Sequence, residues 1–488
     1  MVRETFSDNI TLTPDKESDF VTEVNPGLSV NRQGRRVKLN LDYEMQNVFY
    51  AGNSDSNKIN NYLRADGNAE LVQDHLFLDG YGYVQPEYLL PDGTVGEGDF
   101  GGFGAAISPF RWGFTPLGEQ FTSLNNNQTT AVSFALSPYW RQNLGGYATA
   151  LARYGYGILN YTQTEGGAAP ANARNNLVNL GLNSGSYFSR LEWDLQYNNQ
   201  RLDQEQDQEL DQELDQENAN DNTYENASGQ FRYRFSNKWG LVGQGGYQNN
   251  DVPDQVVVNG GYWSLGPEWT PSRYISAAAL YGFRDWSVRL RLNPTVRTAL
   301  ELSRSDRQVG VEPGPRWAAT LIHSTRHTTW SASYQEEPTS VQGVQFAQLV
   351  TVGQQQPLAP QPVFTPTNQN FFQKSFLASV TYQKGRSELA LGFYDERREF
   401  IDPADNEKSF GTGLAWGWRL TPRTRTILGG QWQQYQSSAD QWWVGSFLLE
   451  HNLSRYISGL LGYRYFQREL SPDNIQENRF QLGLQAQF

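Results

Sequence analysis

The chain has 488 residues, with 39 basic against 52 acidic side chains, 14% aromatic residues, 46 Gly and no Cys. The absence of Cys excludes a disulfide framework, an iron–sulfur cluster, a thiolate zinc site and covalently attached haem. The acidic balance argues against a nucleic-acid partner. A hydrophobic content of 38% with a mean hydropathy of −0.64 excludes a helical membrane protein, whose spans each need about 20 apolar residues.

A transmembrane β-barrel fits this composition, because only every second residue of its strands must be apolar. The first strand is predicted over residues 3–12, and it must run away from the periplasm if the N-terminus starts there. Residues 1–9 are polar and contain no signal peptide. We therefore expect the numbering to begin near the mature N-terminus, with an export signal removed or absent.

The first clear alternation of apolar and polar residues follows near the N-terminus. It consists of Val37, Leu39, Leu41 and Tyr43 between Lys38, Asn40, Asp42 and Glu44. A strand places these two sets on opposite faces, one suited to lipid and the other to water.

A long loop is predicted at residues 87–126, and it contains the Gly-rich stretch GDFGGFG at residues 98–104. This stretch lacks the Lys-Ser/Thr of a phosphate-binding loop and does not lie between a strand and a helix, so it is interpreted as a flexible loop. The loop is long enough to fold into a lumen and constrict it, or to stand above the membrane as a cap.

Within a second predicted loop, residues 202–222, the sequence repeats Asp-Gln-Glu-X four times between Asp203 and Asn218. A solvated surface loop between two strands is the first interpretation. The alternative is that its carboxylates recruit Ca²⁺ or repel anionic material at a pore mouth. No EF-hand spacing is present, so the sequence does not support a specific calcium site.

In mid-chain, Val288, Leu290 and Leu292 alternate with Arg289, Arg291 and Asn293. Residues 284–286 must serve as a very tight outer turn, because a single long strand there would break the parity of the count. With this turn the chain makes about 24 strands, within a range of roughly 22–26, and an even number places both termini in the periplasm.

The remaining elements continue the same pattern to the end of the chain. Residues 338–370 form another long predicted loop that could fold inward. After it, Leu414, Trp416, Trp418 and Leu420 alternate with small residues and Arg419. The last strand alternates to the final residue, with Phe480, Leu482, Leu484, Ala486 and Phe488 between Gln481, Gly483, Gln485 and Gln487.

Short connections alternate with long ones along the whole chain, as in outer-membrane barrels with short periplasmic turns and long extracellular loops. A large soluble β-protein such as a propeller would show the same alternation, but the sequence has no internal repeat of about 40 residues. Tryptophan and tyrosine near the strand ends are expected to form two interfacial girdles. These residues are Tyr50, Tyr139, Trp140, Trp239, Trp263, Trp269, Trp330, Trp442 and Trp443.

The C-terminal strand resembles the terminal recognition strand of bacterial outer-membrane barrels, with Phe480, Leu482, Leu484 and Phe488 as the barrel-assembly signal. Three further stretches resemble the β-barrel proteins associated with PEP-CTERM/exosortase exopolysaccharide systems, the type 2 β-barrel porins. These stretches are residues 6–12 (FSDNITL), 25–30 (NPGLSV) and 323–334 (HSTRHTTWSASY). The resemblance implies an outer-membrane location in a Gram-negative cell and a link to exopolysaccharide or surface-protein export. It supplies no catalytic residues.

The four histidines offer no catalytic or metal site on this topology. His75, His323, His327 and His451 all fall at or near periplasmic turns, without a nucleophile motif. His323 and His327 are four residues apart but flank a turn instead of sharing a helix face. The many carboxylates lie mostly in loops, so no acid–base pair can be singled out. We expect no enzyme, no cofactor and no metal.

A barrel of this size encloses a lumen that side chains cannot fill. Mixed charges with Gln would make a hydrated wall able to bind sugars or water without strong ion selection, although any wide barrel needs such a wall. The alternation predicts these pore-lining residues: Lys38, Asp42, Glu44, Arg289, Arg291, Arg419, Gln431, Gln433, Arg464, Gln481 and Gln485.

Three functions follow from this architecture. The leading one is an outer-membrane conduit, for which the resemblance to exosortase-associated barrels implies exopolysaccharide or a related polymer as the cargo. The alternatives are a general diffusion porin for small solutes, and a structural sleeve around a partner such as a multihaem cytochrome. The expected partners are outer-membrane lipid and lipopolysaccharide, the barrel-assembly machinery, and either periplasmic export components or a protein in the lumen.

Overall fold

The computed structural model describes residues 1–89, 95–96, 128–162, 172–205, 221–253, 255–339, 370–435, 440–469 and 474–487. The Gly-rich stretch, nearly all of the acidic repeat, Phe488, and most of the loops 87–126 and 338–370 lie outside these residues. In the described part of the chain, no helix is long and apolar enough to cross a membrane.

Antiparallel strands make up almost all of the described structure, as the period-two pattern predicts. Two single-turn 3₁₀ helices, η1 (Ser54–Ser56) and η2 (Pro403–Asp405), lie in connections. The first fourteen strands are β1 (Val2–Ser7), β2 (Asp19–Val24), β3 (Gly27–Gln33), β4 (Val37–Tyr50), β5 (Lys58–Val72), β6 (Leu76–Leu89), β7 (Val95–Gly96), β8 (Gln128–Asn143), β9 (Ala148–Tyr161), β10 (Asn172–Ser184), β11 (Leu191–Glu205), β12 (Asn222–Arg234), β13 (Trp239–Gln248) and β14 (Val257–Val258).

The second half of the chain continues in the same way. Its strands are β15 (Gly260–Ser272), β16 (Ile275–Phe283), β17 (Asp285–Thr295), β18 (Thr298–Arg307), β19 (Gly310–Val311), β20 (Gly314–Ser324), β21 (Thr328–Thr339), β22 (Phe371–Lys384), β23 (Ser387–Glu399), β24 (Glu407–Arg419), β25 (Thr424–Tyr435), β26 (Asp440–Asn452), β27 (Ile457–Glu469) and β28 (Asn474–Ala486).

These strands close into one antiparallel barrel, because β1 pairs with β2 on one side and with β28 on the other. Strands β2 and β3 both pair with β4 and together form one wall strand, interrupted at Asn25 and Pro26. Counting them as one, and leaving out the two-residue β7, reduces the 26 strands of the sheet to 24. The predicted architecture and strand number are confirmed.

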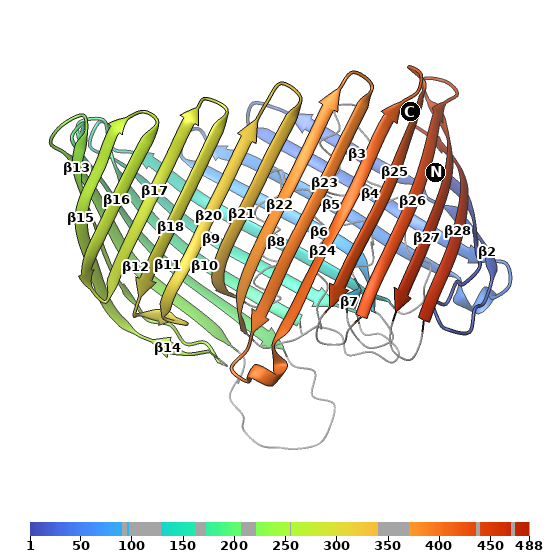
Figure 1. Cartoon of the computed structure of the whole chain (residues 1–488), viewed down its shortest axis with the longest axis horizontal. Coiled ribbons are helices and arrows are strands. Elements are labelled where there is room, and N and C mark those ends of the chain that lie inside the picture. The colour runs from blue at the N-terminus through green and yellow to red at the C-terminus, as the bar shows by residue number, and fades with distance from the viewer. Residues whose placement is uncertain are drawn as a thin grey trace.

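The short turns gather at one end of the barrel, together with both termini, and the longer connections lie at the other end with one tight turn among them (Figure 1). We call these the short-turn end and the loop end. The tight turn predicted at residues 284–286 is present at the loop end. Arg284 adopts a positive φ of 56°, and Tyr281 of β16 already pairs with Trp286 of β17.

The first strand is shorter than predicted and ends at Ser7 instead of residue 12. Asn9 turns the chain, because its side-chain amide donates to the carbonyl oxygens of Thr13 and Gln476 at 2.8 and 2.9 Å. Leu12, with a φ of 53°, then packs against Phe466 and Ile475. An apolar residue that the alternation assigns to a strand is thus buried by a loop.

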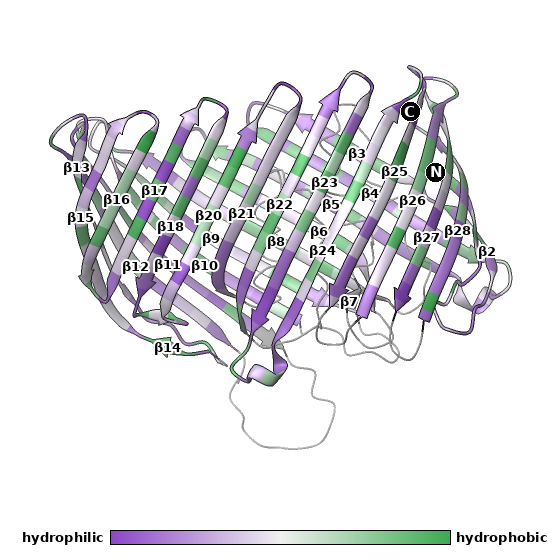
Figure 2. Ribbon diagram, viewed as in Figure 1, coloured by the Kyte–Doolittle hydropathy of each residue, from purple (hydrophilic) through white to green (hydrophobic). Residues whose placement is uncertain are grey.

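The two faces of the wall differ as a membrane barrel requires. Phe480, Leu482 and Leu484 alternate on β28 with Arg479 and Gln481; the three apolar side chains are 52–65% exposed and the two polar ones 1% and 6%. In a single closed wall only the concave side can be covered by the rest of the protein, so the apolar face points outward. Apolar and polar residues alternate along the strands in Figure 2.

The aromatic girdles are only partly as predicted. Trp140, Trp239, Trp263, Trp269, Trp330 and Trp443 lie on the outward face and are 41–55% exposed. Tyr50, Tyr139 and Trp442 lie on the opposite face, and Tyr50 and Trp442 are buried there. The reason is the strand period: Tyr139–Trp140 and Trp442–Trp443 are adjacent pairs, and neighbouring residues of a strand cannot both face outward.

Candidate functional site: the lumen wall and its mouth

The structure places every predicted pore-lining residue on the lumen face of its strand. Lys38, Asp42 and Glu44 share the face of β4 that carries the buried Gln46, and the register of the neighbouring strands extends this face around the wall. Their role in solute contact stays a prediction.

The predicted residues differ sharply in exposure. Lys38, Asp42, Arg289 and Arg291 are exposed, whereas Glu44, Arg419, Gln431 and Gln485 are half-buried. Gln433, Arg464 and Gln481 are only 3–6% exposed. A side chain covered to this extent offers almost no surface to a passing solute, so the lumen wall is not equally accessible around its circumference.

The covered lumen residues belong to a region that we call the packed arc, formed by β23–β28 together with β1, β2 and β4. Several of its largest side chains form ion pairs that are buried from solvent. Arg3 contacts Glu23 at 2.7 Å with side-chain exposures of 3% and 1%. Arg479 contacts Glu477 at 2.7 Å, both at 1% exposure, and Arg468 pairs with Asp440. In each of these three pairs the buried charge has an opposite partner, so the pairs themselves carry no net charge.

Hydrogen bonds donated by uncharged side chains extend these ion pairs along the wall. The amide of Gln46 donates to Glu23 at 2.7 Å, and Asn60 donates to Gln46 at 2.9 Å. On the other side of the arc, the hydroxyl groups of Tyr394 and Ser409 are 2.9 Å apart, and Tyr394 donates to Gln433 at 3.2 Å. The packed arc is therefore a buried polar core linked by ion pairs and hydrogen bonds, and not an open pore surface.

The opposite region of the lumen face carries mainly uncharged amides, which we call the amide wall. Gln200 donates to Asn175 at 3.0 Å, and Asn179 donates to Asn198. None of these side chains is fully buried. The amide wall spans β10–β13 and consists of Asn175, Asn179, Gln196, Asn198, Gln200, Asn226, Gln230, Gln244 and Gln248.

Two arginines of the lumen face beside the amide wall, Arg232 and Arg234, are neutralised at the short-turn end. Arg232 contacts Glu192 at 3.2 Å and Glu268 at 2.9 Å, and Arg234 contacts Glu192 at 2.9 Å. Sequence reasoning missed the amide wall, although its signal was present: Asn or Gln recurs at every second position of β11 from Gln196 to Gln200.

A bridge of described residues joins distant parts of the wall at the loop end. Asn222, the first residue of β12, and Asn370, next to β22, exchange two side-chain hydrogen bonds of 3.0 Å, and Asn370 also donates to the carbonyl of Pro253. Seven strands separate β12 from β22 along the wall. Strands β14 and β19 add a two-stranded ribbon between the connections of β13–β15 and β18–β20. No sequence pattern indicates such pairing of remote loops.

A second polar network lies on the lumen face of the strands that carry this ribbon. The carboxylate of Asp285, at 1% side-chain exposure, accepts hydrogen bonds from Gln244 at 2.7 Å, from Arg307 at 2.9 Å, and from Ser264. The guanidinium of Arg307 also lies 3.8 Å from the ring centre of Tyr262. Every oxygen of this buried carboxylate thus has a donor, as a structural role requires. Among the described residues, no group of three or more His, Asp or Glu could hold a metal ion.

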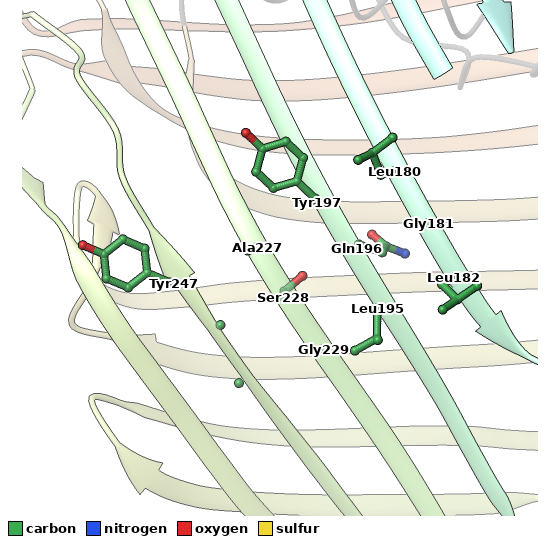
Figure 3. A pocket seen from close by; sticks show the side chains of 12 residues that line it. Leu180, Gly181, Leu182, Leu195, Gln196, Tyr197, Ala227, Ser228, Gly229 and Tyr247 are labelled. Carbon is green, nitrogen blue, oxygen red and sulfur yellow. The ribbon is translucent and has the colours of Figure 1, made fainter. Parts of the chain in front are cut away.

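A shallow hollow of about 550 Å³ lies on β10–β13 (Figure 3). Leu180, Leu195 and Tyr247, which are 45–57% exposed, border it, and Ala227 and Gly229 leave room between them. The register pairs Leu195 with Gly229, so these residues share the outward face. The hollow therefore faces lipid, opposite to the amide wall, and is not part of the lumen.

A closed wall without free edges, apolar outside and polar inside, satisfies every backbone group within a hydrocarbon layer. The chain is a bacterial outer-membrane β-barrel of 24 strands. The short-turn end is then the periplasmic end, and the loop end is the extracellular end.

Neither a protein-family model nor a curated protein sequence matches the chain. Solved structures match it in fold. A ferric enterobactin receptor variant (PfeA) of Pseudomonas aeruginosa in complex with enterobactin aligns with 10% identity and a TM-score of 0.50, over 100% of this chain and 81% of that one. The FrpB iron transporter of Neisseria meningitidis aligns with 9% identity and a TM-score of 0.47, over 99% and 82%. At such identities the likeness concerns the fold alone.

Proposed function

We propose that this barrel is a transport channel of the outer membrane, and that its cargo is a neutral or weakly charged polysaccharide. The amide wall is the observation that carries the proposal. A carboxamide donates and accepts hydrogen bonds at the same time and has no charge to retain an ion. Sugar hydroxyl groups need such partners, and exchange between successive amides keeps each contact weak enough for the polymer to move on.

The electrostatics of the lumen support a weakly charged cargo. The ion pairs of the packed arc cancel in place, and Arg232 and Arg234 are neutralised by Glu192 and Glu268. A lumen built to select ions would carry a ring of one sign. The described part of the amide wall instead consists of uncharged groups.

The resemblance to exosortase-associated barrels adds the direction and class of cargo, namely export of an exopolysaccharide. A general diffusion porin is the second candidate, and it is favoured by the exposed charges of Lys38, Asp42, Arg289 and Arg291 on the lumen face. No described contact favours a sleeve around a multihaem cytochrome over these two. We propose that the barrel has no enzymatic activity.

Planar-bilayer recording with neutral oligosaccharides tests the proposal. Added oligosaccharide should block the current of the wild-type channel transiently, with residence times that grow with chain length as more amides are engaged. The variant Asn198→Ala, combined with Asn175→Ala, should shorten these blocks several-fold, because each lost hydrogen bond is worth about 1 kcal/mol. Asn199→Ala is the matched control, since the adjacent residue lies on the outward face.

The outcomes separate the candidates. Blocks that shorten in the lumen variant and not in the control support a saccharide channel. A large steady current without any block by oligosaccharide would instead identify a diffusion porin. Identical block kinetics in the wild type and the lumen variant would refute a role for the amide wall in solute binding.

A further inference from the structure

Arg304 is a positive charge on the lipid-facing side of the barrel. It pairs in register with Val288 of β17 and Trp317 of β20, and the next row toward the periplasm consists of Leu290, Leu302 and Ala319. Val288 is 48% and Trp317 is 47% exposed on this face. Because Arg304 stands three residues before the extracellular end of β18, it marks the boundary between the apolar band and the outer headgroup layer.

Two tryptophans hold the guanidinium of Arg304. Its Cζ atom lies 4.8 Å from the ring centre of Trp317 and 5.7 Å from that of Trp286. Stacking on indole faces occupies the flat sides of the guanidinium and leaves its N–H edge available. The indole N–H of Trp286 donates to Asp306 at 3.3 Å, which helps to fix the ring.

Other cations of the outward face, also near the loop-end termini of their strands, have carboxylate partners. Lys374 contacts Glu399 at 2.5 Å, and Arg397 and Lys408 contact Asp395 at 3.2 and 3.3 Å. Within the described residues, no carboxylate lies within ion-pair distance of Arg304. An arginine at the edge of hydrocarbon stays charged and is costly there without an anion.

We propose that Arg304, Trp286 and Trp317 form a binding site for the phosphorylated headgroup of an outer-leaflet lipid. The guanidinium edge offers two parallel N–H donors, which match two oxygens of a phosphate. The acyl chains attached to that headgroup lie along the apolar row of Leu290 and Leu302. A free phosphate ion gains nothing from this row, so the arrangement favours the lipid. The site does not depend on which solute the lumen carries.

Native mass spectrometry of the purified full-length barrel in detergent tests this site, with bisphosphorylated lipid A as the probe. Arg304→Gln should weaken the tightest lipid-binding event by roughly tenfold, the usual loss for one charge-assisted contact. Arg304→Lys keeps the charge without the planar fork and should fall between this variant and the wild type. Arg397→Gln removes an equal charge from the outward face near the loop end of β23 and should bind like the wild type. Heat-dependent gel mobility verifies that each variant is folded.

Three results would overturn the proposal. One is equal binding of lipid A by the wild type and Arg304→Gln. Another is equal binding of lipid A and of the same lipid with its phosphates removed, which would show that only the acyl chains are recognised. The third is displacement of the lipid by excess inorganic phosphate that itself remains bound, which would identify a site for the free ion. Loss in Arg304→Gln but not in Arg397→Gln, for the phosphorylated lipid alone, supports the site.

Discussion

The packed arc and the amide wall are built from the same alternating strand pattern, yet they present opposite kinds of lumen surface. In the packed arc Arg479 and Arg468, two of the largest polar side chains, are 1% exposed. In the amide wall the shorter Asn and Gln side chains remain accessible. Alternation therefore determines which residues face inward, whereas side-chain length and charge pairing determine whether the inward face is buried as a core or exposed as a surface.

Substitutions in the two regions should also have different effects on the stability of the fold. Removing one partner of a buried ion pair strands a charge away from water, which is far more costly than removing an exposed one. A polar core of ion pairs therefore makes the packed arc a rigid part of the wall, including the seam at which β1 meets β28. The amide wall can lose a side chain and leave nothing stranded.

The largest effect is expected from breaking an ion pair of the packed arc. Glu23→Ala removes the carboxylate that Arg3 and Gln46 both contact, and takes away the opposite charge that faces the buried Arg3. The free energy of unfolding should fall by about 3–5 kcal/mol. Urea-induced unfolding in lipid vesicles, followed by tryptophan fluorescence, measures this loss.

Glu301→Ala is the matched control on the open side of the lumen. Its partner Arg291 contacts it at 2.7 Å, but the two side chains are 49% and 53% exposed. The control should lose no more than about 1 kcal/mol. Equal losses in the two variants would show that the packed arc is hydrated and would remove the distinction between the two regions.

An intermediate effect is expected at the bridge across the extracellular mouth. Asn370→Ala removes the exchanged pair of hydrogen bonds with Asn222 and the bond to Pro253. The buried amide of Asn222 is left without this partner, at a cost of about 1–3 kcal/mol. The loss of stability should be confined to the loop end, because only two residue pairs join β14 to β19 in the ribbon there.

Hydrogen–deuterium exchange measures this local cost. The amides around Val257 and Gly310 should exchange faster in Asn370→Ala than in the wild type, while β27 and β28 remain unchanged. Asn249→Ala serves as the control, because its side chain reaches only Glu225 on the outward face. Unchanged exchange in the ribbon would mean that the bridge between Asn222 and Asn370 does not stabilise the connections at the loop end.

The sequence predicted the barrel, its closure and its strand number because these depend on local period and on connection length. It also assigned Arg464, Gln433 and Gln481 to the lumen face from the alternation alone. It could not predict that they are buried, since burial there depends on side chains from several strands that are remote in sequence. The bridge between Asn222 and Asn370 could likewise not be predicted, because two isolated asparagines form no recognisable sequence pattern.

The end of the first strand shows the same limit on a small scale. Alternation extends it to residue 12, but Asn9 diverts the chain through hydrogen bonds to Thr13 and Gln476. Gln476 lies at the other end of the sequence and becomes a neighbour only when the barrel closes. Local pattern therefore fails where closure creates new contacts, and the seam is the place where those contacts concentrate.

The smallest effect is expected from a half-buried carboxylate at this seam. Asp8 lies in the loop after β1 and accepts hydrogen bonds from the backbone and side chain of Asn478 at 2.6 and 2.8 Å, and from Lys16 at 3.3 Å. Partial burial raises the pKa of Asp8, but the bonds from Asn478 and Lys16 outweigh it and hold the pKa below the usual 3.8. A lowered pKa stabilises the folded state above pH 3.8, and this contribution is lost as the pH falls through the folded-state pKa.

Asp8→Asn should abolish that acid-dependent step and leave the rest of the stability profile unchanged. The step should amount to a few tenths of a kcal/mol, because solvent screens this carboxylate, in contrast to the ion pairs of the packed arc. Unfolding measured between neutral and acidic pH for the wild type and the variant resolves the difference. A step as large as the loss expected for Glu23→Ala would mean that the packed arc extends into the loop after β1. The buried polar core at the seam would then include Asp8.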